Sequence, residues 1–166
     1  METSEQDVHE LAKRLGARLV MKGLKLATAE SCTGGWIAKV LTDIAGSSDW
    51  FDSAIVSYSN EAKKHFLKVP AGILLDHGAV SENTVLAMQQ GIFMETRADA
   101  GISVSGIAGP GGGSEEKPVG TVWVAVSLRD QMVHTQKFLF EGDRNRVRLQ
   151  AVAAALRSLL ELLERG

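Results

Sequence analysis

The stretch Thr28-Ala29-Glu30-Ser31-Cys32-Thr33-Gly34-Gly35 separates a run typical of a β-strand, residues 24–27, from a run typical of a helix, residues 36–41. The first backbone N–H groups of a helix have no partner within the helix and carry partial positive charge. A hydroxyl or thiol at such a junction can attack a carbonyl, and the free N–H groups can hold an oxyanion or a phosphate. Ala29 replaces the first glycine of the G-x-S-x-G pattern of hydrolases. A polar N-cap on an ordinary helix is therefore the alternative interpretation.

Composition places the chain among globular proteins. It has 166 residues, of which 45% are hydrophobic and 23% charged, and this size favours one domain over residues 1–166. A net charge of −2 argues against broad attraction to nucleic acid or to membranes. The acidic start lacks the layout of a signal peptide, so we expect a cytoplasmic protein. The single cysteine excludes an internal disulfide, and no Cys/His cluster has zinc spacing, so we expect no metal and no cofactor.

Hydrophobic periodicity divides the rest of the chain into alternating helices and strands. The predicted helices cover residues 4–22, 36–45, 61–67 and 82–97, with a last helix that begins after Asp143. Ser4 with Asp7 resembles a capping signal for the first helix, and Asn60 is expected to cap the third. Met88 and Met94 are expected to fill the core. The predicted strands cover residues 24–30, 54–58, 100–105, 121–128 and 132–140, and residues 74–79 are predicted to form a loop or short turn. Helices between strands, followed by a late hairpin, predict an α/β sandwich with a mixed sheet.

A candidate base follows the second predicted strand. Lys63 and Lys64 lie shortly after Tyr58 on a short helix, and we expect Ala62 and Phe66 to face the core from that helix. A lysine near a nucleophile can act as a base if burial lowers its pKa. Solvated lysines are the alternative, and the pattern alone does not decide between the two.

Two further features are typical of phosphate or sugar binding. Residues 106–120 form a long glycine-rich loop after a strand, although they lack the endings of a P-loop or a dinucleotide fingerprint. Arg144 and Arg148 lie one turn apart at the start of the last helix, where a bound anion would offset their conflict with the helix dipole. The alternatives are a flexible surface loop and solvated arginines paired with Glu141 or Asp143.

Six blocks of sequence occur in one order: residues 28–35 (TAESCTGG), 58–63 (YSNEAK), 78–81 (GAVS), 105–110 (SGIAGP), 117–122 (KPVGTV) and 140–144 (FEGDR). Together they closely resemble the CinA carboxy-terminal domain family, over residues 11–159. The resemblance implies a three-layer α/β/α sandwich and a metal-independent amidohydrolase. It also implies a reaction, the conversion of nicotinamide mononucleotide and water to nicotinic acid mononucleotide and ammonia in pyridine nucleotide salvage.

The resemblance also implies roles for particular residues. Ser31 would be the nucleophile, and Lys63, with Tyr58, would move its proton. The residues expected to hold the oxyanion or the substrate are Glu30, Thr33, Gly34, Gly35, Ser105, Gly106, Gly109 and Arg144. Cys32 competes with Ser31 for the role of nucleophile, but the four histidines are scattered and none is identified as its base.

A function of another class is the alternative. The chain could be a non-catalytic nucleotide-binding or interaction module that has kept the pocket without turnover. For either function we expect a small-molecule nucleotide as ligand, no nucleic acid or membrane partner, and a homo-oligomer, most simply a dimer built on an exposed hairpin edge or an apolar helix face.

Overall fold

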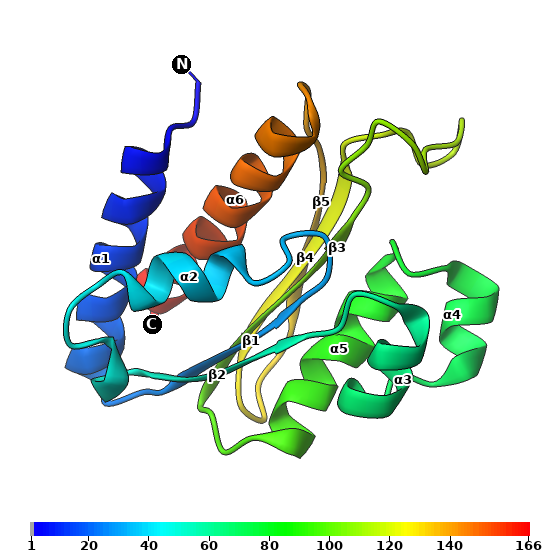
Figure 1. Cartoon of the computed structure of the whole chain (residues 1–166). Coiled ribbons are helices and arrows are strands. Elements are labelled where there is room, and N and C mark those ends of the chain that lie inside the picture. Colours follow the sequence, from blue (N-terminus) through cyan, green and yellow to red (C-terminus); the bar gives the residue numbers. More distant parts are fainter. Residues whose placement is uncertain (1) are drawn as a thin grey trace.

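A five-stranded mixed sheet runs through the computed structural model, which describes residues 2–166 (Figure 1). The strands are β1 (Leu26–Glu30), β2 (Phe51–Val56), β3 (Ala100–Gly106), β4 (Thr121–Leu128) and β5 (His134–Leu139). Their order in the sheet is β2-β1-β3-β4-β5. The first three strands are parallel, whereas β4 pairs antiparallel with both β3 and β5. The predicted mixed sheet and the late hairpin are therefore confirmed.

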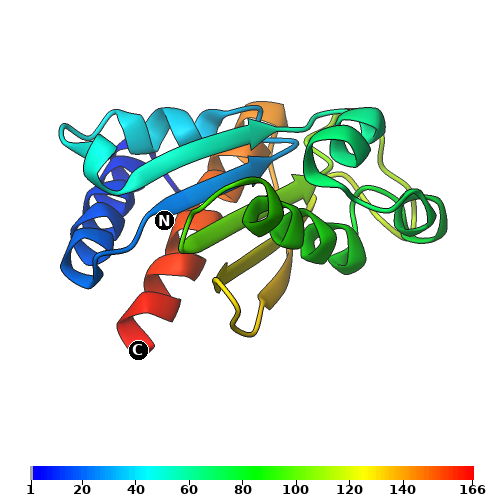
Figure 2. The same cartoon turned by 90° about the horizontal axis from the view of Figure 1, so that it is seen from below.

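Helices cover both faces of this sheet, as Figures 1 and 2 show. One layer holds α1 (Glu5–Lys22), α2 (Trp36–Thr42) and α6 (Arg144–Arg165); the other holds α3 (Asn60–Leu67), α4 (Ala71–His77) and α5 (Glu82–Glu95). A short 3₁₀ turn, Ser47–Asp49, leads into β2. The expected three-layer α/β/α sandwich is confirmed. Within residues 2–166, no helix is both long and apolar enough to cross a membrane.

Side chains that point to alternate faces of each strand form two separate hydrophobic cores, one on each face of the sheet. Leu26 of β1 packs in the core beneath α1, α2 and α6, whereas Ala27 and Ala29 pack in the core beneath α3, α4 and α5. Successive side chains of a strand point to opposite faces of the sheet, which explains this division. Strand β4 divides in the same way, with Val124 in the first core and Ala125 in the second.

Side-chain caps start the two longest helices where the sequence predicted. Ser4 and Asp7 form a capping box at α1, and Gly23 ends that helix in the left-handed conformation. Asp143 caps α6 by accepting a hydrogen bond from the Arg146 N–H. These two helices pack against each other in one layer.

Four local predictions were wrong. Residues 71–77 form helix α4, whereas residues 74–79 were predicted to form a loop or short turn. The helix begins directly after Pro70, and its Leu74 is buried against α5. Strand β2 begins and ends earlier than predicted, and Ser59, not Asn60, caps α3. Met94 was expected in the core, but 62% of it is exposed.

The parallel strands bring three loops to one edge of the sheet. Strand β1 lies between β2 and β3, so the segments that follow all three strands meet there. The ladder continues beyond β1, because the Ser31 N–H donates to the Val104 carbonyl and the Ser57 N–H donates to the Glu30 carbonyl. The carboxyl ends of parallel strands are where α/β proteins bind ligands.

Candidate active site

Ser31 and Lys63 meet at this edge of the sheet. The Lys63 Nζ lies 2.9 Å from the Ser31 Oγ, 2.8 Å from the Ser57 carbonyl oxygen and 3.2 Å from the Tyr58 carbonyl oxygen. A neutral amine has two N–H donors and one lone pair. With its two N–H groups on the two carbonyls, its lone pair is left for the Ser31 hydroxyl. The arrangement therefore suits a serine nucleophile with a lysine base.

Lys63 reaches the serine because it lies on the buried face of α3. Lys63 and Leu67, four residues apart, are both fully buried, whereas 53% of Phe66 is exposed. The prediction that Ala62 and Phe66 face the core was therefore wrong by one position. Burial lowers the pKa of Lys63 from 10.5 to about 8, and the nearby Cys32 acts weakly in the opposite direction. A neutral amine is then accessible near neutral pH.

The side chains of Ser31 and Cys32 point to opposite faces of the sheet, because consecutive side chains of an extended segment alternate. Ser31 continues the register of Ala29 toward the layer that contains α3 and Lys63, whereas Cys32 packs in the opposite apolar core. Burial raises the pKa of the Cys32 thiol to about 12. The thiolate, which is the reactive form of cysteine, is therefore strongly disfavoured. Of the two candidate nucleophiles, only Ser31 contacts the buried amine.

The carboxylate of Glu30 is fully buried behind the junction loop, residues 31–35. It accepts hydrogen bonds from the Thr33 hydroxyl at 2.6 Å and from the N–H groups of Gly35, Ile37 and Ala38 at 3.0–3.1 Å. Glu30 thus satisfies the free N–H groups at the start of α2, where a negative charge is favourable. Its predicted part in binding the substrate remains a prediction.

The junction loop leaves few of its own N–H groups available. The Gly34 N–H donates to the Ser31 carbonyl, and the Gly35 N–H donates to Glu30. Within residues 2–166, no main-chain carbonyl accepts a hydrogen bond from the N–H groups of Cys32 and Thr33. Gly34 and Gly35 have φ values of 59° and 98°, which side chains rarely adopt, so the turn requires glycine there.

Arg144 links the glycine loop, residues 106–120, to the segment after β2. Its guanidinium donates to the Gly109 carbonyl at 2.7 Å and to the Tyr58 hydroxyl at 3.0 Å. Because the Tyr58 carbonyl contacts Lys63, these contacts run from Arg144 through Tyr58 to the serine–lysine pair. The Tyr58 hydroxyl itself lies at Arg144, and its predicted help to Lys63 in moving the proton remains a prediction.

Ser105 and Gly106, at the end of β3, make close contacts within the protein. The Ser105 hydroxyl donates to the Ala79 carbonyl at 2.8 Å. A side chain at Gly106 would meet Val122, because an added Cβ would lie 2.6 Å from its nearest methyl group. Both residues hold the start of the glycine loop in place. Their predicted contacts with a substrate remain predictions.

The sequence named Arg148 but did not predict its contacts with the junction loop. Its spacing from Arg144 suggested a bound anion, with solvated arginines as the alternative. In the structure its guanidinium donates to the carbonyls of Cys32 and Thr33 at 3.0 and 3.1 Å. Its partners lie more than a hundred positions away in the chain, so no local pattern could have revealed them.

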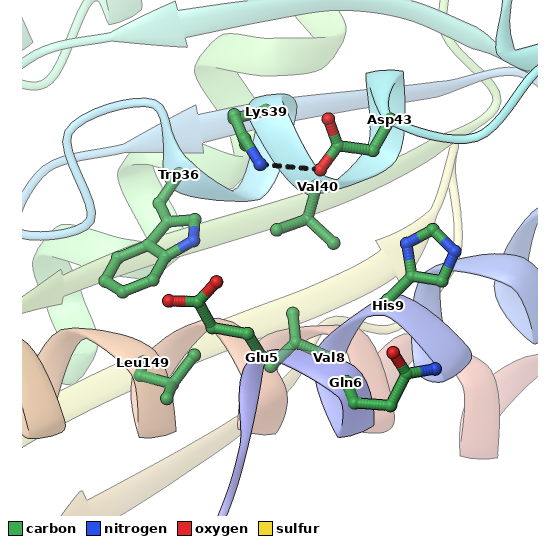
Figure 3. A pocket seen from close by; sticks show the side chains of 9 residues that line it. All are labelled: Glu5, Gln6, Val8, His9, Trp36, Lys39, Val40, Asp43 and Leu149. Atoms are coloured by element: carbon green, nitrogen blue, oxygen red, sulfur yellow. Dashed lines mark hydrogen bonds and ion pairs between the residues drawn. The ribbon is translucent and has the colours of Figure 1, made fainter.

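A separate cavity of about 250 Å³ lies between α1, α2 and α6 (Figure 3). Figure 3 shows the ion pair between Lys39 and Asp43 on one side of it and Trp36 nearby. The residues that line it do not include Ser31 or Lys63. Within residues 2–166, no three histidine, cysteine, aspartate or glutamate side chains are grouped so that they could hold a metal ion.

Comparison with known proteins covers nearly the whole chain. The sequence model of the CinA C-terminal domain matches residues 8–163. The chain is 51% identical to nicotinamide-nucleotide amidohydrolase PncC of Escherichia coli strain K12, over 94% of each protein. It is 53% identical to the protein of the same name from Enterobacter agglomerans, over 95% of this chain and 96% of that protein. The structure resembles the crystal structure of the competence/damage inducible protein CihA from Agrobacterium tumefaciens, with a TM-score of 0.93, 43% identity and 99% coverage of both chains.

Proposed function

The chain belongs to the CinA C-terminal domain family, and we propose that it hydrolyses the amide of nicotinamide mononucleotide to nicotinic acid mononucleotide and ammonia. Two close relatives named nicotinamide-nucleotide amidohydrolase support this proposal. The observation that carries it is the 2.9 Å contact between a buried lysine amine and the Ser31 hydroxyl. Pyridine nucleotide salvage, a cytoplasmic location, independence of metal ions and a homodimer are parts of the same proposal.

The first half of the reaction forms an ester on Ser31. The Ser31 Oγ attacks the carboxamide carbon while its proton passes to the neutral Lys63 amine. The tetrahedral intermediate then breaks its C–N bond, and Lys63 returns the proton to the departing nitrogen. One molecule of ammonia leaves, and the acyl group remains on the serine oxygen.

The second half of the reaction uses water. Lys63, neutral again, takes a proton from a water molecule that attacks the ester carbon. Collapse of the second intermediate breaks the bond to the Ser31 Oγ, and Lys63 gives the proton back to that oxygen. The product is the free carboxylic acid, so one amide and one water yield one acid and one ammonia.

Negative charge develops on the carbonyl oxygen in both halves. The N–H groups of Cys32 and Thr33 are the donors of the junction loop that have no main-chain acceptor within residues 2–166, so we assign the oxyanion to them. Gly34 and Gly35 were also expected to hold the oxyanion or the substrate. Their N–H groups already have acceptors in the protein, so we do not assign the oxyanion to them.

The phosphate of the substrate is assigned to Arg144. Its guanidinium is anchored by the Gly109 carbonyl, and an exposed arginine with unused donors is well suited to a phosphate. The glycine loop beside it would contact the ribose through its backbone N–H groups.

Ammonia release from nicotinamide mononucleotide tests the reaction and the nucleophile together. Wild type and Ser31→Ala are compared with a chelator present and no metal added. We expect turnover in the wild type and a loss of at least about 10³-fold in Ser31→Ala, because no nucleophile remains. Substrate binding by Ser31→Ala, measured by calorimetry, should be retained.

Cys32→Ala is the matched control for Ser31→Ala. It removes the thiol but keeps the backbone N–H, so turnover should continue. Activity in Ser31→Ala that disappears in Cys32→Ala would reverse the choice of nucleophile. Binding without turnover in the wild type would favour the non-catalytic nucleotide-binding module.

Substrates of increasing size test the assignment of Arg144. Nicotinamide, its riboside and its mononucleotide are compared in wild type and in Arg144→Ala. We expect the wild type to prefer the mononucleotide and Arg144→Ala to lose about 1.5–3 kcal/mol of that preference, the contribution of a charge-assisted hydrogen bond. Equal values of kcat/KM for all three substrates in the wild type would rule out a phosphate site at Arg144.

A further inference from the structure

The side chain of Arg148 holds the junction loop from the side of α6. Its Nε lies 3.0 Å from the Cys32 carbonyl oxygen and its Nη2 lies 3.1 Å from the Thr33 carbonyl oxygen. Within residues 2–166, the Cys32 carbonyl accepts a hydrogen bond from Arg148 alone, whereas the Thr33 carbonyl also accepts one from the Trp36 N–H. The orientation of the Cys32 carbonyl therefore depends on one guanidinium.

The geometry of a peptide bond connects this contact to the oxyanion. The Cys32 carbonyl and the Thr33 N–H belong to the same planar, trans peptide unit, and they point in opposite directions. A guanidinium that holds the carbonyl toward α6 therefore makes the N–H point away from α6. A charged donor on the carbonyl also polarises the peptide unit and strengthens its N–H as a donor.

The rest of the loop is held by other groups. Glu30 accepts the N–H groups of Gly35, Ile37 and Ala38, and the Gly34 N–H is bound to the Ser31 carbonyl. These bonds fix the peptide units after Thr33 but do not hold the unit between Cys32 and Thr33. Arg148 supplies the missing restraint on the peptide unit whose N–H is assigned to the oxyanion.

Arg148 is itself held in place. Its guanidinium carbon lies 5.3 Å from the centre of the Trp36 ring, within the range of a cation–π contact. Its neighbours on α6, Val147 and Leu149, are buried in the core. Trp36 also lines the cavity between α1, α2 and α6 (Figure 3). A planar guanidinium stacked on a ring is far less free than a solvated side chain.

We propose that Arg148 is a positioning residue that aims the Thr33 N–H at the oxyanion of the proposed amide hydrolysis. This inference rests on the proposed function. Arg148 donates to two main-chain carbonyls of the junction loop, and we give it no contact with the reacting atoms. Its effect is therefore on stabilisation of the transition state, whereas Arg144, which contacts Tyr58 and Gly109, is assigned to the phosphate.

Steady-state kinetics on nicotinamide mononucleotide separate the two roles. We expect Arg148→Ala to lower kcat by about 10- to 100-fold, the scale of a misplaced catalytic group, with little change in KM. Arg148→Lys should recover only part of the rate, because an ammonium cannot reproduce the fixed fork of donors that reaches both carbonyls. Arg146→Ala is the matched control, since Arg146 donates to the Thr3 carbonyl and not to the junction loop. It should keep the wild-type kcat.

Added guanidinium supplies a readout that a general loss of stability would not produce. At concentrations too low to unfold the protein, it should raise the kcat of Arg148→Ala severalfold by occupying the vacated position beside Trp36. It should not raise the kcat of wild type or Arg146→Ala. Substrate affinity, measured by calorimetry in Ser31→Ala and in the double variant Ser31→Ala/Arg148→Ala, should be the same. If Arg148→Ala does not fold, Arg148→Lys and Arg148→Gln provide the same comparison.

The outcomes distinguish this inference from the proposed function. An active wild type with unchanged kcat in all Arg148 variants would overturn the inference alone. A higher KM with unchanged kcat, or weaker substrate binding by the double variant, would move Arg148 to ground-state binding and overturn it as well. A wild type that releases no ammonia would overturn the proposed function and, with it, the role given to Arg148.

Discussion

Lys63 combines full burial with contacts to three oxygen atoms. A lysine in such a site loses the hydration of its charged form, and this loss lowers its pKa from 10.5 to about 8. The two carbonyl contacts, from Ser57 and Tyr58, orient the amine without neutralising its charge. The result is an amine that is a useful base near neutral pH and that faces the Ser31 hydroxyl.

The pH dependence of the reaction follows from this shift at the residue scale. In the proposed reaction the neutral amine of Lys63 is the base, and its fraction rises as pH increases through the folded pKa of about 8. We therefore expect kcat/KM to rise about tenfold per pH unit below pH ~7 and to level off above pH ~9. Rates measured between pH 6 and 10 provide the test. An increase in kcat/KM with an apparent pKa near 10.5, the pKa of an exposed lysine, would contradict this prediction.

At the scale of single elements, α2 depends on a residue outside the helix. It has only seven residues and its N-cap, Gly35, offers no side-chain cap. The buried Glu30 carboxylate replaces that cap from the end of β1 by accepting three main-chain N–H groups and the Thr33 hydroxyl. The same residue thereby joins the first strand, the junction loop and the second helix into one unit.

Glu30→Gln tests this arrangement with almost no change in shape. One carboxylate oxygen becomes an NH₂ group, which would face N–H donors in a fully buried site. We expect a loss of about 1–3 kcal/mol in the free energy of unfolding, the cost of buried donors without acceptors, and a lower kcat. Urea unfolding measures the first effect. Glu61→Gln, which breaks only an exposed ion pair with Lys64, is the control and should change stability by less than about 1 kcal/mol. Equal losses in the two variants would count against the capping role of Glu30.

On the scale of the whole molecule, the position of Lys63 depends on how α3 packs against α5. A Cβ added to Gly91 of α5 would lie 2.1 Å from the Leu67 carbonyl oxygen, which is main chain at the end of α3. The two helices therefore approach as closely as they do only because residue 91 is glycine. Lys63 and Leu67 lie on the same face of α3, so the spacing of the two helices also determines where the Lys63 amine lies.

Gly91→Ala is expected to move α3 and with it Lys63, the proposed base. We predict a loss of about 1–3 kcal/mol in the free energy of unfolding, typical of overpacking, together with a lower kcat. Thermal unfolding and ammonia release measure the two effects. Gly72→Ala is the matched control, because a Cβ at that position in α4 meets nothing within 4 Å. It should be neutral or stabilising by up to about 1 kcal/mol. Full activity in Gly91→Ala would show that the close approach of α3 and α5 is not needed to position Lys63.

Local signals were sufficient for the elements that have strong periodicity and clear caps. The α1 capping box, the hairpin of β4 and β5, and the start of α6 at Asp143 were all predicted from sequence. Helix α4 was missed because seven residues after a proline carry too little periodicity to be distinguished from a loop. The predicted buried face of α3 was wrong because lysine is a polar residue in a hydrophobicity pattern, although packing buries Lys63.

The order of the helices and strands follows from local patterns in the amino-acid sequence, as do the strand-to-helix junction and the serine, lysine and arginines near the predicted loops. The folded chain is needed to place the Ser31 hydroxyl against a buried amine and the Cys32 thiol in the opposite core. It is also needed to place Arg148 on the junction loop, which lies more than a hundred residues away in the sequence. Hydrophobic pattern and capping act over only a few residues along the chain. Strand register and helix packing, which set distances between remote side chains, exist only in the folded molecule.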